Sequence, residues 1–307
     1  MTKRGRWSKW ALIGYFLIFL LFLYGPILVM AVLSLQGPQG SITFPLKGFG
    51  IGWWHSLFDQ DIPFSTADRI RETGTRSLLL ALAAGALVSF FALSLSMAFR
   101  RRFRGDGALF YLIMLALMTP GILLSLGTSL FWQTMGYLPG LWQTALGTNV
   151  VWGIPFGFLV MVAVWNRYDR RVEEAARDLG ADLRTTFREV TLPLIWTGLF
   201  GAFLFGFTLS WNEYDRTALV LGAGQATLPL HVVSLTLASV IRPDLYALGT
   251  ATTLVSLLGV AIFLIGATIV LRRRAAAPPP EAQAKEELGE VVGATPDEPA
   301  GAATRAR

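Results

Sequence analysis

The chain of 307 residues contains no cysteine and only two histidines, which excludes several kinds of chemistry. Without cysteine there are no disulfides, thiolate metal sites or cysteine nucleophiles. His55 and His231 are far apart and lack the spacing of metal ligands, so we predict no metal site and no catalytic residue. The phosphate-binding pattern G-x-x-x-x-G-K-[ST] is also missing, so this chain cannot hold a nucleotide as a P-loop ATPase does, and we expect no cofactor in it.

Charge is scarce as well. Charged residues make up 15% of the chain and hydrophobic residues 53%, and the mean hydropathy is +0.53. These values favour a membrane protein over a soluble one. The net charge of +6 would suit nucleic acid, but the basic residues cluster beside apolar runs, which is typical of membrane topology. We therefore predict contact with membrane lipid and none with nucleic acid.

Long apolar runs dominate what is present. A spanning helix needs about 20 mostly apolar residues, and in lipid its backbone groups must be paired internally. The first run follows Lys3, Arg4, Arg6 and Lys9 but is too long for a signal peptide. We predict an all-α membrane protein with six transmembrane helices at about 11–35, 77–99, 108–132, 148–165, 194–214 and 247–271.

The distribution of Lys and Arg predicts the orientation. Basic residues are concentrated in the segment 1–10, in the loop after the second span and in the loop 167–193. The positive-inside rule then places both termini in the cytoplasm. The tail 275–307 is rich in Ala, Pro and Glu and poor in large apolar residues, so we predict that it is disordered. The six-helix domain therefore occupies 11–271.

The polar loop 167–193 is patterned too regularly for a simple connection. Gly180 is a poor residue for a helix interior and a good one for a helix end, so we predict two short helices with a bend there. Leu192-Pro193 is expected to stop the second helix before the next span. An amphipathic loop lying on the membrane surface remains an alternative. Apolar residues recur at helical spacings of three and four, at Val172, Ala175, Ala176, Leu179, Leu183, Phe187 and Val190.

One spacing in this loop carries a family resemblance. Glu174-Ala175-Ala176, three residues, Gly180, nine residues and Val190-Thr191-Leu192-Pro193 resemble the EAA signature of type I binding-protein-dependent ABC importer permeases, with Val190 where the signature has Ile. The resemblance implies a coupling helix that docks into a groove of the ATPase subunit, although Glu174 on a solvated face is an alternative. The implied coupling residues are Glu174, Ala175, Ala176, Leu179, Gly180, Leu183, Phe187, Leu192 and Pro193.

The resemblance extends from about residue 11 to 271 and implies a type I ABC importer transmembrane domain. "MTPGILLSLG" at Met118, "FTLSWNEYD" at Phe207 and the stretch from Leu228 resemble permeases of spermidine/putrescine systems. The implied protein is a multi-pass permease of the bacterial inner membrane that is not itself an enzyme. Its implied partners are an ABC ATPase dimer that binds ATP and magnesium, a second permease subunit in a heterodimer, and a periplasmic or surface substrate-binding protein. The implied cargo is a polyamine or related amine, with phosphonate, opine, iron or thiamine as alternatives.

The substrate path has weaker signals. Trp211, Glu213, Tyr214 and Asp215 lie near the outer end of the fifth span, and a carboxylate beside aromatic rings suits an organic cation. A salt bridge from Glu213 to Arg216 at i+3 is the alternative, and interfacial Trp and Tyr are ordinary in membrane proteins. Pro120 and Pro155 lie inside predicted spans and are expected to kink them. His231 lies in an apolar run too short to span, which we interpret as a short outer helix with a structural histidine.

Two other classes remain open. A secondary transporter driven by an ion gradient is expected to carry charged residues at the midplane of its spans. A membrane-embedded enzyme needs paired aspartates, a Ser/His set or a metal motif within the spans. The sequence offers neither pattern, so both are less favoured than an importer permease.

Overall fold

The computed structural model describes residues 3–38, 46–57, 66–238 and 243–276. Within these ranges the regular structure is helical, apart from an isolated bridge between Gln36 and Phe49. Two of the helical segments, η1 and η2, are π-helical turns. The elements are α1 Lys3–Leu33, α2 Gly52–Ser56, α3 Thr66–Ala98, α4 Asp106–Met118, α5 Gly121–Thr134, η1 Leu141–Ala145, α6 Leu146–Trp165, α7 Arg171–Asp178, α8 Leu183–Thr185, η2 Thr186–Thr191, α9 Leu192–Trp211, α10 Asp215–Ala218, α11 Leu228–Ala238 and α12 Pro243–Ala276.

The all-helical membrane class predicted from the sequence is confirmed. In the described part of the chain, five helical runs are long and apolar enough to cross a bilayer, and one bent pair raises the number of candidate spans to six. Several helices extend beyond the predicted apolar runs; α3, for example, begins at Thr66 with charged turns that precede the run. α12 continues to Ala276, and the rest of the tail lies outside the described residues. The sidedness of the termini stays a prediction.

The third predicted span is divided in two. α4 and α5 meet at an angle of 103°, which is much more than a kink within one helix. The break falls at Thr119-Pro120, where Thr119 has an extended backbone with φ −70° and ψ 126°. Proline crowds the residue before it out of the helical region and cannot continue the ladder of hydrogen bonds. Pro155, in contrast, lies inside α6 without interrupting it.

The proline that was expected to end a helix does not end it. α8, η2 and α9 run without a gap from Leu183 to Trp211, with Pro193 in the first turn of α9. The prediction that Leu192-Pro193 separates the loop helix from the span is therefore wrong. The π-helical turn η2 directly precedes α9, so the missing N–H of Pro193 falls where the hydrogen-bonding pattern changes. Proline is also well tolerated in the first turn of a helix.

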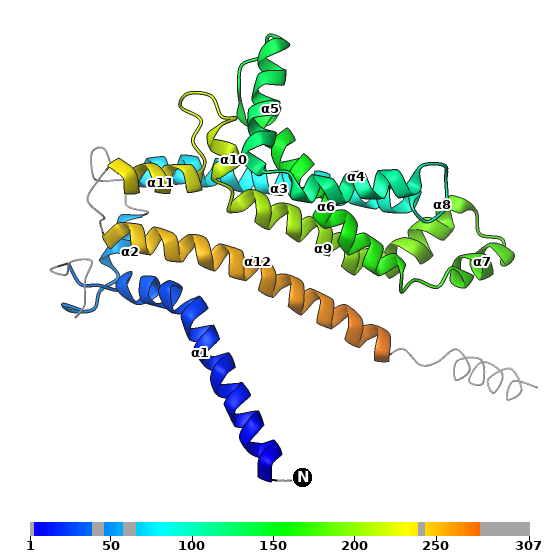
Figure 1. Ribbon diagram of the computed structural model, residues 1–307, viewed down its shortest axis with the longest axis horizontal. Helices are drawn as coiled ribbons and strands as arrows, with labels where there is room; N and C mark the ends of the chain where they lie inside the picture. The colour runs from blue at the N-terminus through cyan, green and yellow to red at the C-terminus, as the bar shows by residue number, and fades with distance from the viewer. Residues whose placement is uncertain (1–2, 39–45, 58–65, 239–242, 277–307) are drawn as a thin grey trace, which may run out of the picture. The chain divides into compact units, whose positions relative to one another are not determined.

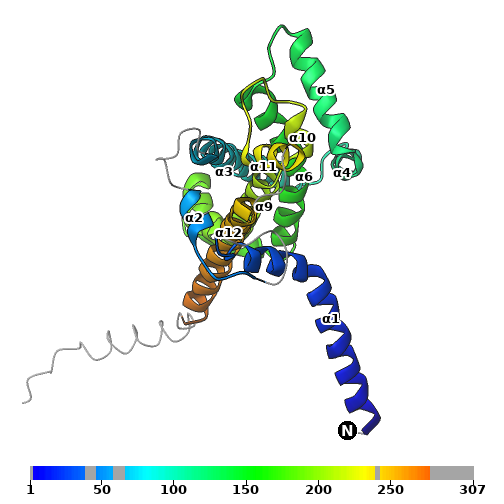
Figure 2. The same cartoon turned by 90° about the vertical axis from the view of Figure 1, so that its left-hand side faces the viewer.

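α3, α6 and α9 pack against one another along their lengths (Figures 1 and 2). Glycines make the close approach possible. A Cβ added at Gly85 of α3 would lie 2.8 Å from the carbonyl oxygen of Phe203, and one at Gly206 of α9 would lie 2.9 Å from the Cα of Gly85. A Cβ at Gly153 of α6 would lie 2.6 Å from Val88. Small residues serve the same purpose in membrane helices generally.

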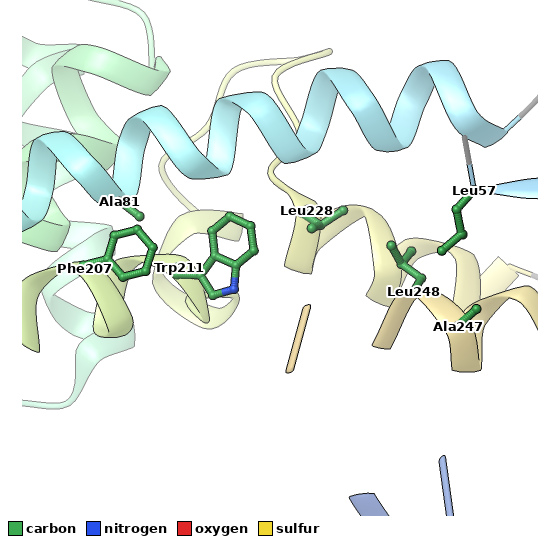
Figure 3. Close-up of a cluster of buried hydrophobic side chains, with 7 residues drawn as sticks. All are labelled: Leu57, Ala81, Phe207, Trp211, Leu228, Ala247 and Leu248. Carbon is green, nitrogen blue, oxygen red and sulfur yellow. The ribbon is translucent and has the colours of Figure 1, made fainter. Parts of the chain in front are cut away.

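A buried apolar cluster joins the ends of several helices (Figure 3). It brings α3 and α9 together with α11, the start of α12 and the residue after α2. This cluster holds the C-terminal end of α9, next to the predicted path residues. Its buried members are Leu57, Ala81, Phe207, Trp211, Leu228, Ala247 and Leu248.

Contacts divide the chain into the compact units Met1–Phe263 and Leu264–Arg307. The first unit contains the loop 167–193 and the predicted path residues. In the second unit the structure describes residues up to Ala276, which form the end of α12.

Candidate functional site

The predicted bend in the loop 167–193 is present and has a defined geometry. α7 ends at Asp178, and Gly180 has φ +90°, a left-handed value that favours glycine. The N–H of Gly180 donates to the carbonyl of Arg177 at 2.8 Å, and that of Ala181 donates to Ala176 at 3.1 Å. This pair of bonds is the Schellman motif, which satisfies the last carbonyls of a helix. The expected bend at Gly180 and the short helix before it are confirmed, whereas the helix after the bend is the start of the continuous run from Leu183 to Trp211.

The second short helix has its own start signal. The side chain of Asp182 accepts a hydrogen bond of 2.7 Å from the backbone N–H of Thr185, as an N-cap residue does. The segment between α7 and α8 is therefore a turn closed at both ends. Both short helices lie together at one end of the helix group formed by α3, α6 and α9 (Figure 1).

The apolar stripe of the loop faces outward. Leu179 is 90% exposed and Leu183 is 73% exposed, although both are large apolar side chains in a polar segment. Val172 is 43% exposed and Ala175 is also exposed, whereas Ala176, Phe187 and Val190 are half-buried. An exposed stripe of this kind has no partner within the described residues, and such surfaces are typical of binding sites.

Glu173 and Glu174 are neighbours on α7 that differ in burial. Glu174 is exposed, as expected for a residue available to a partner. Glu173 is 7% exposed, and its Oε1 lies 2.9 Å from Nη2 of Arg100. The hydroxyls of Tyr168 and Thr191 donate to the same oxygen at 2.8 Å and 2.9 Å. One carboxylate therefore holds side chains from three separate parts of the chain.

These contacts change the acidity of Glu173. Burial, the largest single influence, favours the neutral carboxyl and raises its pKa. The hydrogen bonds from Thr191, Tyr168 and Arg100 stabilise the charged form and together outweigh burial, so the pKa of Glu173 is lowered from its ordinary value. Glu173 is therefore an ionised, fully partnered carboxylate at neutral pH.

The sequence did not single out Glu173 or its partners. In the sequence, Arg100 is one of the basic residues that indicate membrane orientation, and nothing in the sequence marks Tyr168 or Thr191 as a partner of Glu173. Their partnership joins residues 73 and 18 positions apart, so no local periodicity reveals it. The sequence does contain one usable signal. Glu173 lies outside the periodic apolar stripe, so it faces the helix group if that stripe faces a partner.

The predicted path residues do not form one open site in this chain. Trp211 is 6% exposed and belongs to the apolar cluster of Figure 3. Glu213 is 9% exposed and forms an ion pair with Arg216, whose backbone N–H also donates to it at 2.7 Å. The Arg216 guanidinium lies 4.5 Å from the ring centroid of Trp152. The salt-bridge alternative for Glu213 is thus observed.

Of the four path candidates, Asp215 is exposed and Tyr214 is half-buried. A role of these residues in transport stays a prediction. The short helix expected around His231 is present as α11, and burial, followed by the charge of Arg69, lowers the pKa of His231. Neutral His231 fits the structural role predicted for it.

The fold and the coupling-type segment define a class, namely a multi-pass membrane transport protein of the type I importer kind. The chain belongs to the family of binding-protein-dependent transport system inner membrane components, whose model matches residues 90–276. It is therefore a permease subunit of an ABC importer and a component of the inner membrane. The family resemblance inferred from the EAA-like spacing is confirmed.

Named relatives match over most of their length. The spermidine/putrescine transport system permease protein PotC of Haemophilus influenzae is 28% identical over 237 residues, covering 77% of this chain and 88% of the relative. PotC of Escherichia coli K12 is 28% identical over 247 residues, covering 80% and 89%. The putrescine transport system permease protein PotI of the same organism is 28% identical over 251 residues, covering 79% and 85%.

Solved structures confirm the fold. A bacterial ABC transporter involved in the import of the acidic polysaccharide alginate matches with a TM-score of 0.62 at 17% identity, covering 87% of this chain and 98% of that one. An alginate ABC transporter in complex with a pentasaccharide-bound periplasmic protein matches with a TM-score of 0.57 at 15% identity, covering 86% and 93%. At these identities the likeness extends to the fold alone.

Proposed function

We propose that this permease moves a polyamine, such as spermidine or putrescine, from a substrate-binding protein into the cytoplasm. Its partners in the proposal are a second permease subunit and a separate ATPase dimer that hydrolyses ATP with magnesium. The likeness to PotC and PotI over most of the chain is the observation that carries the proposed cargo. The outward stripe on α7 and α8 is the observation that carries the proposed contact with an ATPase.

The physical case for that contact rests on Leu179 and Leu183. Burying a leucine side chain stabilises a complex by about 1.5–3 kcal/mol, so two such residues provide a useful part of a docking energy. A short amphipathic helix inserted into a groove uses this arrangement of apolar anchors. Exposed Glu174, next to the stripe, supplies a charge that fixes the register of docking.

The absence of cysteine allows a sharp test of docking. We replace Leu179 with cysteine in one variant and Leu138 with cysteine in a control, so that each contains the only thiol of this chain. Both leucines are strongly exposed, at 90% and 85%, but Leu138 follows α5 and lies outside the loop 167–193. The expected result is that adding the ATPase slows maleimide labelling at position 179 and leaves position 138 unchanged. Equal labelling of position 179 with and without the ATPase would contradict the docking proposal.

The cargo proposal assigns Asp215 and the Glu213–Arg216 pair to the path at the far end of α9. A carboxylate in a partly dehydrated path attracts an ammonium group more strongly than one in water. Glu213 already has Arg216 as a partner, so exposed Asp215 is the freer of the two carboxylates. We expect Asp215→Asn to reduce uptake of putrescine directly. Glu213→Gln leaves Arg216 buried without its counter-charge and is expected to reduce stability as well.

Uptake of radiolabelled putrescine and spermidine by the complete importer in vesicles tests the cargo. Variants are compared at equal amounts of assembled complex. Normal uptake by both Asp215→Asn and Glu213→Gln would show that these carboxylates are structural. A preference of the intact importer for an anionic or neutral solute would overturn the polyamine proposal and leave the family membership unaffected.

A further inference from the structure

α7 is attached to the rest of the chain in an unusual way. Of its eight residues, Arg171–Asp178, Glu173 is the one that is buried. Of its three apolar side chains, Val172 and Ala175 are exposed and the small Ala176 is half-buried, so apolar packing contributes little to holding the helix in place. The attachment of α7 therefore centres on a single carboxylate and its polar partners.

Those partners come from the ends of different helices. Arg100 follows α3, Tyr168 follows α6, and Thr191 closes the π-helical turn that leads into α9. All three donate to Oε1 of Glu173 at distances from 2.8 to 2.9 Å. The other oxygen lies 3.5 Å from Nη2 of Arg177, one turn further along α7. We call Glu173, Arg100, Tyr168 and Thr191 the clasp.

A second set of contacts makes the clasp stiff. The Arg100 guanidinium lies 4.3 Å from the ring centroid of Trp165 and 5.3 Å from that of Tyr168. The indole N–H of Trp165 donates to the hydroxyl of Ser96 at 2.9 Å, which ties the end of α6 to the end of α3. Arginine stacks well on aromatic rings and keeps its charge, so it can serve an ion pair and a stack together.

α7 and α8, the two helices of the proposed coupling segment 167–193, are connected to the spans in different ways. α8 is continuous with η2 and α9, so a displacement of α8 moves α9 through the helix itself. α7 has no such continuity with α3, which ends far away in sequence at Ala98. The clasp connects the side chains of α7 to the end of α3, beside a hydrogen bond from the Arg170 guanidinium, just before α7, to the carbonyl of Arg100. It also reinforces the covalent connection from α7 to α6.

We propose that Glu173 is a positioning residue that transmits the displacement of α7 to the ends of α3 and α6. This inference rests on the proposed docking of an ATPase onto the coupling segment. The two adjacent glutamates have different roles: Glu174 contacts the ATPase, and Glu173 connects α7 to the ends of α3 and α6. Removing the charge of Glu173 leaves Arg100 without its counter-ion and uncouples α3 from α7, while α9 stays connected.

The test follows the movement of two helices separately. Met97→Cys places a fluorophore on α3, and Trp196→Cys places one on α9; these side chains are 36% and 49% exposed. Each is measured in the assembled importer with cysteine-free partner subunits, with and without ATP. The comparison is between wild-type Glu173 and Glu173→Gln. Glu189→Gln is the matched control, because it makes the same chemical change at an exposed glutamate outside the clasp and outside the residues proposed to dock.

We expect the ATP-dependent signal at position 97 to be lost in Glu173→Gln and kept in Glu189→Gln. The signal at position 196 is kept in both. Uptake per ATP hydrolysed falls about tenfold or more in Glu173→Gln, because a buried charge pair has been broken. Tyr168→Phe keeps the ring under Arg100 and removes one donor, so it provides a milder second variant with a partial loss at position 97.

Two results would overturn the inference. One is an unchanged signal at position 97 in Glu173→Gln and Tyr168→Phe. The other is a wild-type importer in which position 196 responds to ATP and position 97 does not. Failure of the ATPase to assemble with the wild-type chain is a different result, because it would overturn the proposed docking itself.

Discussion

Among single residues, Gly180 is important because of its backbone angle. Its φ of +90° is strained for other residues, and an added Cβ would have nothing within 4 Å, so space in this chain is not the constraint. Gly180→Leu is expected to destabilise the turn by about 1–2 kcal/mol. Asparagine tolerates left-handed angles better, so Gly180→Asn is the matched control with a smaller effect.

The measurement is uptake of labelled substrate at equal amounts of inserted protein. We expect the leucine variant to transport poorly and the asparagine variant to keep most of its activity. The affinity of the substrate-binding protein for its ligand stays unchanged in both, because the turn lies outside that protein. Wild-type uptake by Gly180→Leu would remove the turn from the coupling mechanism.

Glu173 gives a pH prediction with a definite sign. Its pKa is lowered in the folded chain from a reference value of 4.5, so the folded state binds this proton less readily than the unfolded state. Such a group stabilises the fold above its unfolded pKa, and the contribution is lost as the pH falls through the folded pKa. The difference in melting temperature between wild type and Glu173→Gln is therefore expected at pH 7 and should shrink below the reference value.

Thermal unfolding in detergent over this pH range checks the prediction. Glu174→Gln changes the neighbouring exposed carboxylate and serves as the control. A wild-type advantage that grows as the pH falls would have the opposite sign and would show that the carboxylate is not held by Arg100, Tyr168 and Thr191.

Close packing of α3 against α9 can be tested at the scale of elements. Gly85 has the carbonyl oxygen of Phe203 2.8 Å from its would-be Cβ, whereas Gly74 on the same helix has nothing within 4 Å. Gly85→Ala is expected to cost about 1–3 kcal/mol through overpacking. Gly74→Ala is expected to stabilise α3 by up to about 1 kcal/mol, because alanine is the better helix former.

Melting temperatures of the two single variants separate these effects. We predict that Gly85→Ala lowers the melting temperature and that Gly74→Ala raises it, although both make the same chemical change on α3. Equal stabilisation by both substitutions would show that α3 and α9 do not approach closely at Gly85.

The sequence predicted the spans well and their interruptions less well. Hydropathy located the apolar runs because length and composition alone decide whether a helix can cross a bilayer. Two prolines had outcomes that local sequence did not distinguish. Pro120 follows an extended Thr119 and divides a span at 103°, whereas Pro193 follows a π-helical turn and is absorbed into a continuous helix.

The candidate site shows the same limit. The EAA-like spacing predicted the bend, because Gly180 and the periodic apolar residues are local signals, and the coupling role of this segment stays a prediction. The burial of Glu173 and its contact with Arg100 depend on how the ends of α3 and α6 meet, so they appear only in the structure. Glu213 is an intermediate case. The sequence offers Arg216 at i+3 as an alternative partner, but the burial of Glu213 appears only in the structure.

At the scale of the whole molecule, the chain is a transport component, and in our proposal a separate ATPase supplies its energy. It contains no P-loop pattern, so the purified chain is expected to hydrolyse no ATP. Hydrolysis should appear only after the ATPase is added. Hydrolysis by the chain alone, well above that of a mock purification, would contradict this division of labour.

The most direct test of the central claim is a comparison of driving forces in one vesicle preparation. Vesicles contain this chain, the second permease and the ATPase, with the loaded substrate-binding protein on the opposite side. The account predicts uptake of labelled putrescine when ATP is present on the ATPase side, and none when an ion gradient replaces ATP. Uptake that needs the gradient and continues without the ATPase would contradict the account and identify a secondary transporter instead.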